Sequence, residues 1–409
     1  QSQTQRVGFF IGWQMILQGT KIIVVGAGIA GLAVARFLGL AGAQVHVIEQ
    51  SPALRTAGAG IQISPNGARV LRALGLEPAL KALGLRAQAV MLQDGFTGQM
   101  VSRATLGEDF YFLHRSDLLG LLADGARNAG VLIEFGQKLA AYDLTGSCPK
   151  IINANGQVNS ASLIIGADGL HSGLRAQLNG ASAPLYTGYV AWRALCDIST
   201  DSESLPVAQV FMAPKRHLVS YPLRAGKLRN LVGVAARSSF TKEGWHMREN
   251  TADFCKTFGD FAPQVQAWLS DLGPDADVGL WGLFRHAPCS DWGRALPKGA
   301  VAILGDAAHP TLPFLAQGAN LALEDAAVFA RAFERFVDLG QALTAYQKAR
   351  AARVKKVVEA ARLNGRAYHL EGVARSLSFG ALRLGGKMAA NIAFRRYRWI
   401  YDYDAMTAV

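Results

Sequence analysis

Lys21–Gly31, KIIVVGAGIAG, lies near the start of a chain of 409 residues and is the most informative segment for its architecture. A run of β-branched residues ends in glycines, and the Ala/Leu-rich segment from Ile29 to about Ala41 is typical of a helix. The next segment, Gln44–Glu49 (QVHVIE), has the pattern of a second buried strand. The sequence therefore predicts a βαβ unit, the building block of an open α/β sheet.

The glycines of this stretch follow the order G-x-G-x-x-G. Gly26 permits the tight turn, Gly28 lets the backbone approach a pyrophosphate, and Gly31 lets helix and strand pack closely. Glu49, eighteen residues after Gly31, is placed to accept hydrogen bonds from a ribose. Glycine-rich turns also occur for structural reasons alone, but the strands and the acid favour a dinucleotide site. This turn does not distinguish NAD from FAD.

A second polar turn, GDAAHP (Gly305–Pro310), follows the buried run Val301–Leu304. Asp306, at the carboxyl end of that strand, is placed to reach a polyol chain, which FAD has in its ribityl group and NAD lacks. His309 is expected to be structural, because the proline after it fixes the turn. This turn therefore favours FAD.

A helix is expected to begin near Gly318, Ala319 and Asn320. Its N-terminal amides would face the flavin and stabilise negative charge on the reduced ring. Glu324 and Asp325, in the same helix, are expected only to complement the helix dipole.

The secondary-structure pattern of the sequence changes between about 186 and 285, where short strand patterns alternate with Pro and Gly turns. The fold class predicted is α/β, with a discontinuous Rossmann-like FAD-binding domain, an inserted and mostly antiparallel β-sheet domain that binds substrate, and C-terminal helices. The predicted boundaries are a flexible N-terminal extension over 1–20, the FAD-binding domain over 21–185 and 286–345, the substrate domain over 186–285 and a C-terminal helical segment over 346–409.

The formal net charge of +12 is concentrated near the C-terminus. Between Lys348 and Arg398 there are 13 Lys or Arg residues against two acids, Glu359 and Glu371. We interpret this run as a solvated face on helices; a field that attracts anionic substrate or nicotinamide cofactor is the alternative. Because aromatic residues do not alternate with these cations before Tyr397, no nucleic-acid partner is expected.

The four cysteines are scattered and form no C-x-x-C pair, so neither a metal site nor a redox dithiol is expected. That pattern fits a cytoplasmic protein. The apolar stretch from Val7 to Ala35 is interrupted by Lys21 and by the glycine turn, so no membrane span is expected.

Further segments carry a resemblance to a known family. With the glycine turn and Glu49, they form a set that resembles the single-component FAD-dependent aromatic hydroxylases, which have the fold of para-hydroxybenzoate hydroxylase. The set is most similar to the salicylate, 3-hydroxybenzoate and 6-hydroxynicotinate hydroxylase group. The segments are HRSDL (His114–Leu118), GADGLHS (Gly166–Ser172), GDAAHPTLPFLAQGANLALEDA (Gly305–Ala326), GAGIQISPNGARVL (Gly58–Leu71) and RRYRWIYDYDA (Arg395–Ala405).

The resemblance implies roles for particular residues. Arg115 is expected to contact the FAD pyrophosphate or ribityl region, Leu139 to lie by the adenine, and Asp168 to support both FAD and transient nicotinamide binding. Pro313 is expected to line the catalytic face of the flavin ring. Gly318, Ala319 and Asn320 would serve its pyrimidine edge.

His217 and Tyr221 stand four residues apart in the strand pattern RHLVSYPL, so their side chains point to the same face. Hydroxylation of an aromatic ring is favoured when a ring hydroxyl loses its proton, and a histidine suits that role. The hydroxylases that the chain resembles carry the same pair before Pro-Leu. We expect His217 to be the base and Tyr221 to relay the proton or orient the ring; a structural histidine is the alternative.

Two positions depart from the relatives that this resemblance suggests. Gln62 stands where some 6-hydroxynicotinate hydroxylases have a histidine, and Pro313 stands where 3-hydroxybenzoate hydroxylases tend to have a polar residue. Both Gln62 and Arg193 are candidates for contact with the substrate. Arg193 would pair with a carboxylate, although a structural ion pair is an equal alternative.

The function implied is an FAD-dependent monooxygenase that consumes NADH or NADPH and O2. It would hydroxylate a small hydroxylated aromatic or pyridine carboxylate through a C4a-hydroperoxyflavin, as a monomer or homodimer. Another FAD oxidoreductase, such as a flavin halogenase, is the first alternative, but a W-x-W-x-I-P run is missing. A non-catalytic flavin-binding scaffold is the second, and it would leave His217 and Tyr221 without a role.

Overall fold

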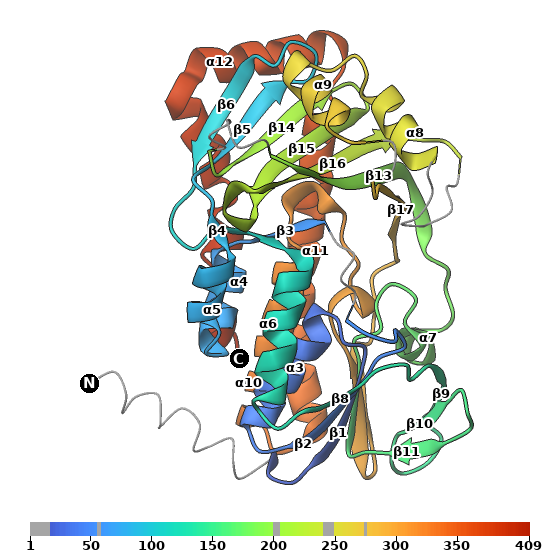
Figure 1. Cartoon of the computed structure of the whole chain (residues 1–409). Helices are drawn as coiled ribbons and strands as arrows, with labels where there is room; N and C mark the ends of the chain where they lie inside the picture. The colour runs from blue at the N-terminus through green and yellow to red at the C-terminus, as the bar shows by residue number, and fades with distance from the viewer. Residues whose placement is uncertain (1–16, 55–58, 199–204, 240–248, 274–275) are drawn as a thin grey trace.

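A computed structural model describes residues 17–54, 59–198, 205–239, 249–273 and 276–409, without the side chains of 249–250 and 387–394. Figure 1 shows two layers of structure, a nucleotide-type α/β part below and a large sheet above. The long helix α11 (Leu339–Tyr368) packs against elements of the lower part through β18 and β19 and reaches the level of the upper sheet.

The lower part is built on a six-stranded sheet in the order β18-β19-β12-β1-β2-β8. The strands from β19 to β8 are parallel, and only β18 is antiparallel to its neighbour. Strands such as β1 and β12 are nearly continuous apolar runs because parallel sheets are covered on both faces. The bounds are β1 (Lys21–Val25), β2 (Gln44–Ile48), β8 (Leu132–Glu134), β12 (Leu163–Gly166), β18 (Gly293–Leu296) and β19 (Gly299–Ile303).

Helices α3, α6 and α10 lie together beside this sheet, and α3 packs against both of the others (Figure 1). The alanines, leucines and glycines of α3 allow this close packing, because small side chains let helices approach. The bounds are α3 (Ile29–Leu40), α4 (Pro65–Ala73), α5 (Glu77–Leu83), α6 (Arg115–Arg127), α7 (Gly173–Asn179) and α10 (Gly318–Arg335).

Two small sheets flank the main one. The first, in the order β3-β7-β4, lies between the two layers (Figure 1), and the second has the order β11-β10-β9. Their bounds are β3 (Gly60–Ile63), β4 (Leu85–Arg86), β7 (Tyr111–His114), β9 (Leu139–Asp143), β10 (Lys150–Asn153) and β11 (Val158–Ser160).

The upper part is a seven-stranded sheet in the order β17-β13-β16-β15-β14-β5-β6, antiparallel except where β14 meets β5. The segment 186–285 does not supply the whole sheet, since β5 and β6 come from residues 89–105. Strand β5 pairs with the edge of β14, which would otherwise leave unpaired backbone groups, and β6 pairs with β5. The bounds are β5 (Ala89–Asp94), β6 (Met100–Thr105), β13 (Leu185–Asp197), β14 (Val207–Ala213), β15 (Arg216–Leu223), β16 (Leu228–Ala236) and β17 (Gly279–Arg285).

The two faces of this sheet have different cover. Helices α8 (Glu249–Thr257) and α9 (Pro263–Ser270) bury an aromatic core on one face, which includes Trp192, Phe254 and Phe258. The other face points toward the lower layer (Figure 1).

The C-terminal helices follow α11. Helix α12 (Gly372–Arg395) packs on β6, and α13 (Arg398–Tyr401) contacts α4. Short 3-10 turns complete the chain: η1 (Arg224–Gly226), η2 (Gly305–Ala307), η3 (Pro313–Leu315) and η4 (Ala405–Thr407). Within the described ranges, no helix combines the length and apolar character needed to cross a membrane.

The predicted N-terminal extension lies outside the described residues up to position 16. Its last residues, 17–20, are not a loose extension. Leu17 is buried in the main core, the amide of Gly19 donates to the carbonyl of Gly42, and the carbonyl of Thr20 accepts from Gln44. The ordered domain therefore begins at least four residues before β1.

Candidate active site

The glycine turn after β1 has the geometry that its sequence predicts. Gly26 has φ = +106°, and a Cβ atom there would collide with the carbonyl oxygen of Ala167. A Cβ at Gly31 would collide with the carbonyl oxygen of Gly26. Gly28 faces open space, so a ligand can approach its backbone. The turn therefore presents backbone that a ligand can approach only because its glycines carry no side chains.

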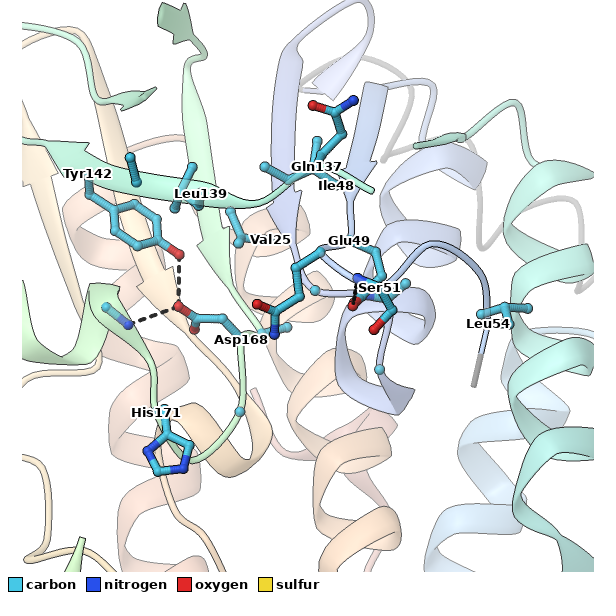
Figure 2. Close-up of a pocket in the computed structure, with 18 of the residues that line it drawn as sticks. Val25, Ile48, Glu49, Ser51, Leu54, Gln137, Leu139, Tyr142, Asp168 and His171 are labelled. Carbon is cyan, nitrogen blue, oxygen red and sulfur yellow. Dashed lines mark hydrogen bonds between the residues drawn. The ribbon is translucent and has the colours of Figure 1, made fainter. Parts of the chain in front are cut away.

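A cavity of about 570 Å³ extends from this turn along the carboxyl ends of β1 and β2 (Figure 2). Its lining includes the predicted residues Glu49, Leu139 and Asp168. The carboxylate of Glu49 accepts hydrogen bonds from the amides of Ala27 (2.9 Å) and Ser51 (2.8 Å). It therefore ties the end of β2 to the turn, and its remaining lone pairs are available to a ribose.

Asp168 is held by residues that the sequence did not single out. Figure 2 shows its Oδ2 accepting hydrogen bonds from the hydroxyl of Tyr142 (2.9 Å) and the amide of Gly173 (3.0 Å). Burial raises the pKa of Asp168, and hydrogen bonds from Ser172 and Tyr142 oppose the rise. Tyr142 lies on β9 three residues after Leu139, and both line the cavity.

A second cavity, of about 420 Å³, lies between the glycine turn and the upper sheet. Both cavities are lined by Gly28, Arg115, Ala167 and Gly169, so they meet at the turn. A dinucleotide laid across the turn would place one end in each cavity. The remaining predicted residues in this second lining are Gln62, Arg193, Tyr221, Asp306, Pro313, Gly318 and Ala319.

The carboxylate of Asp306 opens into the second cavity although protein surrounds it. Desolvation by this surrounding protein raises its pKa, whereas His309 and Arg115 lower it. A carboxylate in such a place gains from a hydroxyl-rich ligand, because hydroxyl donors replace the water that it lost. This fits the ribityl chain of FAD.

The N-terminus of α10 also faces this cavity, through Gly318 and Ala319. The unpaired amides at the start of an 18-residue helix carry partial positive charge. They can stabilise an anion at this end of the cavity, as expected for a reduced flavin.

Asn320 does not line either cavity. It is fully buried, its Oδ1 accepts from the amide of Ser64, and its Nδ2 donates to the carbonyls of Gln62 and Ala316. Asn320 therefore positions β3 and the α10 N-terminus relative to each other.

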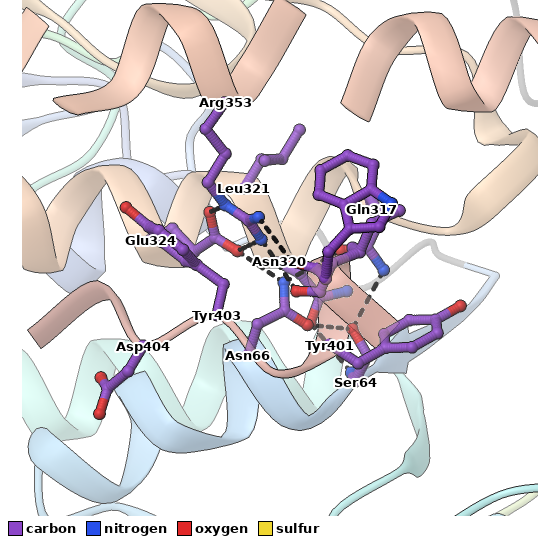
Figure 3. Close-up of polar contacts among 12 residues, drawn as sticks. Ser64, Asn66, Gln317, Asn320, Leu321, Glu324, Arg353, Tyr401, Tyr403 and Asp404 are labelled. Carbon is purple, nitrogen blue, oxygen red and sulfur yellow. Dashed lines mark hydrogen bonds and ion pairs between the residues drawn. The ribbon is translucent and has the colours of Figure 1, made fainter. Parts of the chain in front are cut away.

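A buried polar network extends from Asn320 (Figure 3). The amide group of Asn66 donates to Gln317 Oε1 (3.0 Å) and Glu324 Oε1 (2.6 Å), and Gln317 Nε2 donates to Ser64 Oγ (3.0 Å). Every bond joins α4 or its N-cap to the start of α10. The network therefore sets the wall of the second cavity.

Glu324 and Asp325 do more than complement a helix dipole, so that expectation was wrong. Both are fully buried and are bridged by Arg350, at 2.6 Å and 2.7 Å, and Glu324 also pairs with Arg353. Asp325 further accepts from the amide of Gly305 and pairs with His309 Nε2 at 2.5 Å. His309 and Arg350 outweigh the effect of burial and lower the pKa of Asp325. These pairs hold the turn that carries Asp306.

The same contacts correct part of the interpretation of the basic C-terminal run. Arg350 is fully buried and Arg353 nearly so, so neither belongs to a solvated face. Arg375 pairs with Asp94 on the upper sheet at 2.8 Å. These three cations connect helices to the two layers, while Arg362, paired with Glu359, is exposed as expected.

Tyr221, Gln62 and Arg193 converge on the second cavity from β15, β3 and β13. Burial raises the pKa of Tyr221, and a hydrogen bond with Gln62 and the charge of Arg193 oppose the rise. Desolvation lowers the pKa of Arg193, whose guanidinium lies 5.7 Å from the centre of the Trp281 ring. Within the described residues, no carboxylate forms an ion pair with Arg193.

His217 lies on the same strand face but outside the cavity lining. Its ring is buried between Phe314 and Tyr368, and its Nδ1 lies 2.8 Å from Nε2 of His369. Val219, between His217 and Tyr221, does line the cavity. The sequence pattern predicted neither this second histidine nor the lining residues Val219 and Val232. His369 stands 152 positions from His217, and the two valines have the same pattern as any other apolar strand residue.

Comparisons with known proteins agree with this geometry. A family model described as "FAD binding domain" matches residues 19–361. The 6-hydroxynicotinate 3-monooxygenase of Bordetella bronchiseptica is 34% identical over 351 residues, or 82% of this chain and 89% of the relative. The 3-hydroxybenzoate 6-hydroxylase of Polaromonas naphthalenivorans is 33% identical over 369 residues, which are 87% of this chain and 89% of the relative.

Solved structures show the same fold. HpxO of Klebsiella pneumoniae, complexed with FAD and uric acid, matches with a TM-score of 0.80 and 25% identity over 93% of this chain and 98% of its own. A salicylate hydroxylase substrate complex matches with a TM-score of 0.76 and 23% identity, over 96% of this chain and 97% of its own.

The fold and the two joined cavities thus define a flavoprotein that binds FAD, as the sequence predicted. The chain belongs to the family of FAD-dependent aromatic hydroxylases and is a monooxygenase.

Proposed function

We propose that this enzyme uses NADH or NADPH and O2 to hydroxylate a small hydroxylated aromatic or pyridine carboxylate. The observation that carries the proposal is the convergence of Arg193, Tyr221 and Gln62 on the cavity that also contains Asp306 and the α10 N-terminus. Bound FAD, once reduced, supplies the activation of O2 and the transfer of one oxygen atom. The chain binds and orients the ring and moves its proton.

Arg193 is the residue that would bind the substrate carboxylate. Burial has removed part of the hydration of this guanidinium, and the charge of Asp306 acts on it without forming an ion pair within the described residues. A bidentate substrate carboxylate would therefore stabilise it. The carboxylates in the names of the relatives support this class of substrate. Pro313, on the facing wall, would hold the flavin side of the ring.

Tyr221 would orient the ring hydroxyl. Its raised pKa keeps the phenol neutral at physiological pH, so it donates or relays a proton and does not act as the base. The hydrogen bond with Gln62 fixes the direction of its hydroxyl. Gln62 would thereby take part in substrate orientation without being a base.

His217 would take the proton. Four residues along a strand span about 13 Å, which is room for one aromatic ring over Val219, between Tyr221 and His217. Phe314 packs against the imidazole at 5.7 Å between ring centres. Neutral imidazole is the form that accepts a proton, and burial favours it by lowering the pKa of His217.

A panel of hydroxybenzoates, salicylates and hydroxynicotinates tests the proposal. Each compound is scored for stimulated NADH or NADPH oxidation and for a hydroxylated product, and we expect stimulation by at least one compound with ring hydroxyl and carboxylate. In His217→Ala, product formation should fall far more than FAD content. Absence of stimulation by every compound, in protein that retains FAD, would contradict the proposed substrate class.

A further inference from the structure

The second buried histidine has a position that the proposed chemistry can use. His369 follows the last turn of α11, and its backbone amide caps that helix by donating to the carbonyl of Arg366. Its Nε2 lies 2.8 Å from Nδ1 of His217, 152 residues away in the sequence. The helix C-terminus therefore delivers an imidazole directly to the strand that lines the cavity.

The surroundings of the two rings hold them in place. Tyr189 of β13 stacks on His369 at 5.2 Å between ring centres, Tyr368 packs against His217 at 5.2 Å, and Phe314 contacts both histidines. Burial raises the pKa of Tyr368 to about 12, so its phenol is neutral. Burial also lowers the pKa of His369 to about 4, and that of His217 well below its usual range. Both rings are therefore neutral near pH 7.

Two neutral imidazoles that share one hydrogen bond must divide the roles of donor and acceptor, because each carries one N–H and one lone pair. If His369 Nε2 accepts, His217 is protonated at Nδ1 and its Nε2 is the free base. If His369 Nε2 donates, His217 Nδ1 is the acceptor and its Nε2 carries the proton. Only the first arrangement leaves a base on His217 that is not already engaged by His369.

We propose that His369 is a positioning residue that accepts the Nδ1–H of His217 and thereby selects the tautomer whose Nε2 can take the substrate proton. The proposal rests on the proposed function for the identity of the proton acceptor. The proton leaves the ring hydroxyl for His217 Nε2, and His369 holds the orientation of the receiving ring.

The test compares His369→Phe, which keeps a ring but removes both nitrogens, with His369→Gln, which keeps a hydrogen-bonding group. Histidines labelled with nitrogen-15 are observed by two-bond proton–nitrogen correlation between about pH 6 and pH 8, which distinguishes the tautomers of a neutral ring. His217→Gln identifies the His217 signal among the eight histidines. His46→Gln, which removes a side-chain contact with Glu134 on β8, is the matched control.

We expect His217 to be a single Nδ1–H tautomer in the unchanged protein and a mixture in His369→Phe. The rate constant kcat for hydroxylation should fall about 10-fold in His369→Phe with little change in KM, because ring binding does not use His369. His369→Gln should recover part of kcat, and His46→Gln should alter neither readout. FAD content and the melting temperature establish that each variant is folded.

An unchanged His217 tautomer and unchanged kcat in folded His369→Phe would overturn the proposal, as would an Nε2–H tautomer in the unchanged protein. The spectra do not depend on turnover. A His369-dependent tautomer in a protein that hydroxylates no compound would therefore support the positioning role while rejecting the proposed function.

Discussion

The two cavities of this hydroxylase are built by different means. The lining of the first runs from Val25 to Gln177, where the glycine turn and the ends of β1 and β2 meet side chains such as Leu139, Tyr142 and Asp168. The second also takes residues from the C-terminal part of the chain, so that Gln62 of β3 and Pro313 of η3 stand 251 positions apart. The cofactor site thus begins in one βαβ unit, whereas the proposed substrate site depends on segments that are distant in the sequence.

This contrast predicts that stability, cofactor retention and substrate recognition can be changed separately. The largest effect is expected at the buried cation that joins α11 to α10. Arg350→Met removes the partner of two buried carboxylates, Glu324 and Asp325. Uncompensated buried charge costs about 3–5 kcal/mol of the free energy of unfolding. Chemical denaturation measures the loss, and the exposed pair variant Arg362→Met should show little change. If the free energy of unfolding of Arg350→Met falls no more than that of Arg362→Met, the buried network does not stabilise the fold.

The next effect concerns the cofactor side. Asp306→Asn keeps the shape of the side chain but removes its charge, so the flavin hydroxyls lose a charge-assisted acceptor. We expect FAD to dissociate about 10- to 100-fold more readily, equivalent to roughly 1.5–3 kcal/mol. The amount of flavin released on ultrafiltration measures this increase in FAD dissociation. Asp124→Asn, in an exposed pair with Arg127, is the control. Full FAD retention by Asp306→Asn would mean that the ribityl site lies elsewhere.

On the substrate side, Arg193→Gln should raise KM for a carboxylate substrate about 10- to 100-fold, because a charge-assisted pair is lost. FAD content should not change, since Asp306 and the glycine turn remain. An otherwise identical substrate without the carboxylate should show no such increase in KM. If FAD content falls as KM rises, the cavities do not act separately.

The smallest effect is on the pH dependence of stability. In the unfolded chain His369 has its ordinary pKa, whereas in the folded protein burial lowers it to about 4. The unfolded state therefore binds more protons below about pH 6.5, and the free energy of unfolding falls as pH drops from there toward 4, by at most about 1.4 kcal/mol per pH unit. Denaturation at pH 7.5 and pH 5 should show a smaller decrease in His369→Phe than in the unchanged protein. An identical decrease in both proteins would mean that His369 does not contribute to the pH dependence of the free energy of unfolding.

The comparison also shows where sequence patterns sufficed. Gly31 carries its meaning locally, because a Cβ there would collide with the carbonyl oxygen of Gly26 in the same βαβ unit. At Gly26 the positive φ is a local reason for glycine, while the collision is with Ala167, which follows β12. Asp306 follows a strand directly, so its place at the carboxyl edge could be read from the chain. The role of Glu324 could not, because an acid in the first turns of a helix has the same pattern whether water or Arg350 compensates it.

The dinucleotide turn, the flavin-type polar turn after β19 and the family could be read from the amino-acid order, because each depends on residues that are near one another in the chain. The three-dimensional packing was needed to show that β5 and β6 complete the upper sheet, that Asn320 connects β3 to α10, and that the His217 ring contacts His369. Such pairs are joined by packing between distant segments, and hydrophobic packing constrains volume and shape but leaves no fixed spacing in the sequence.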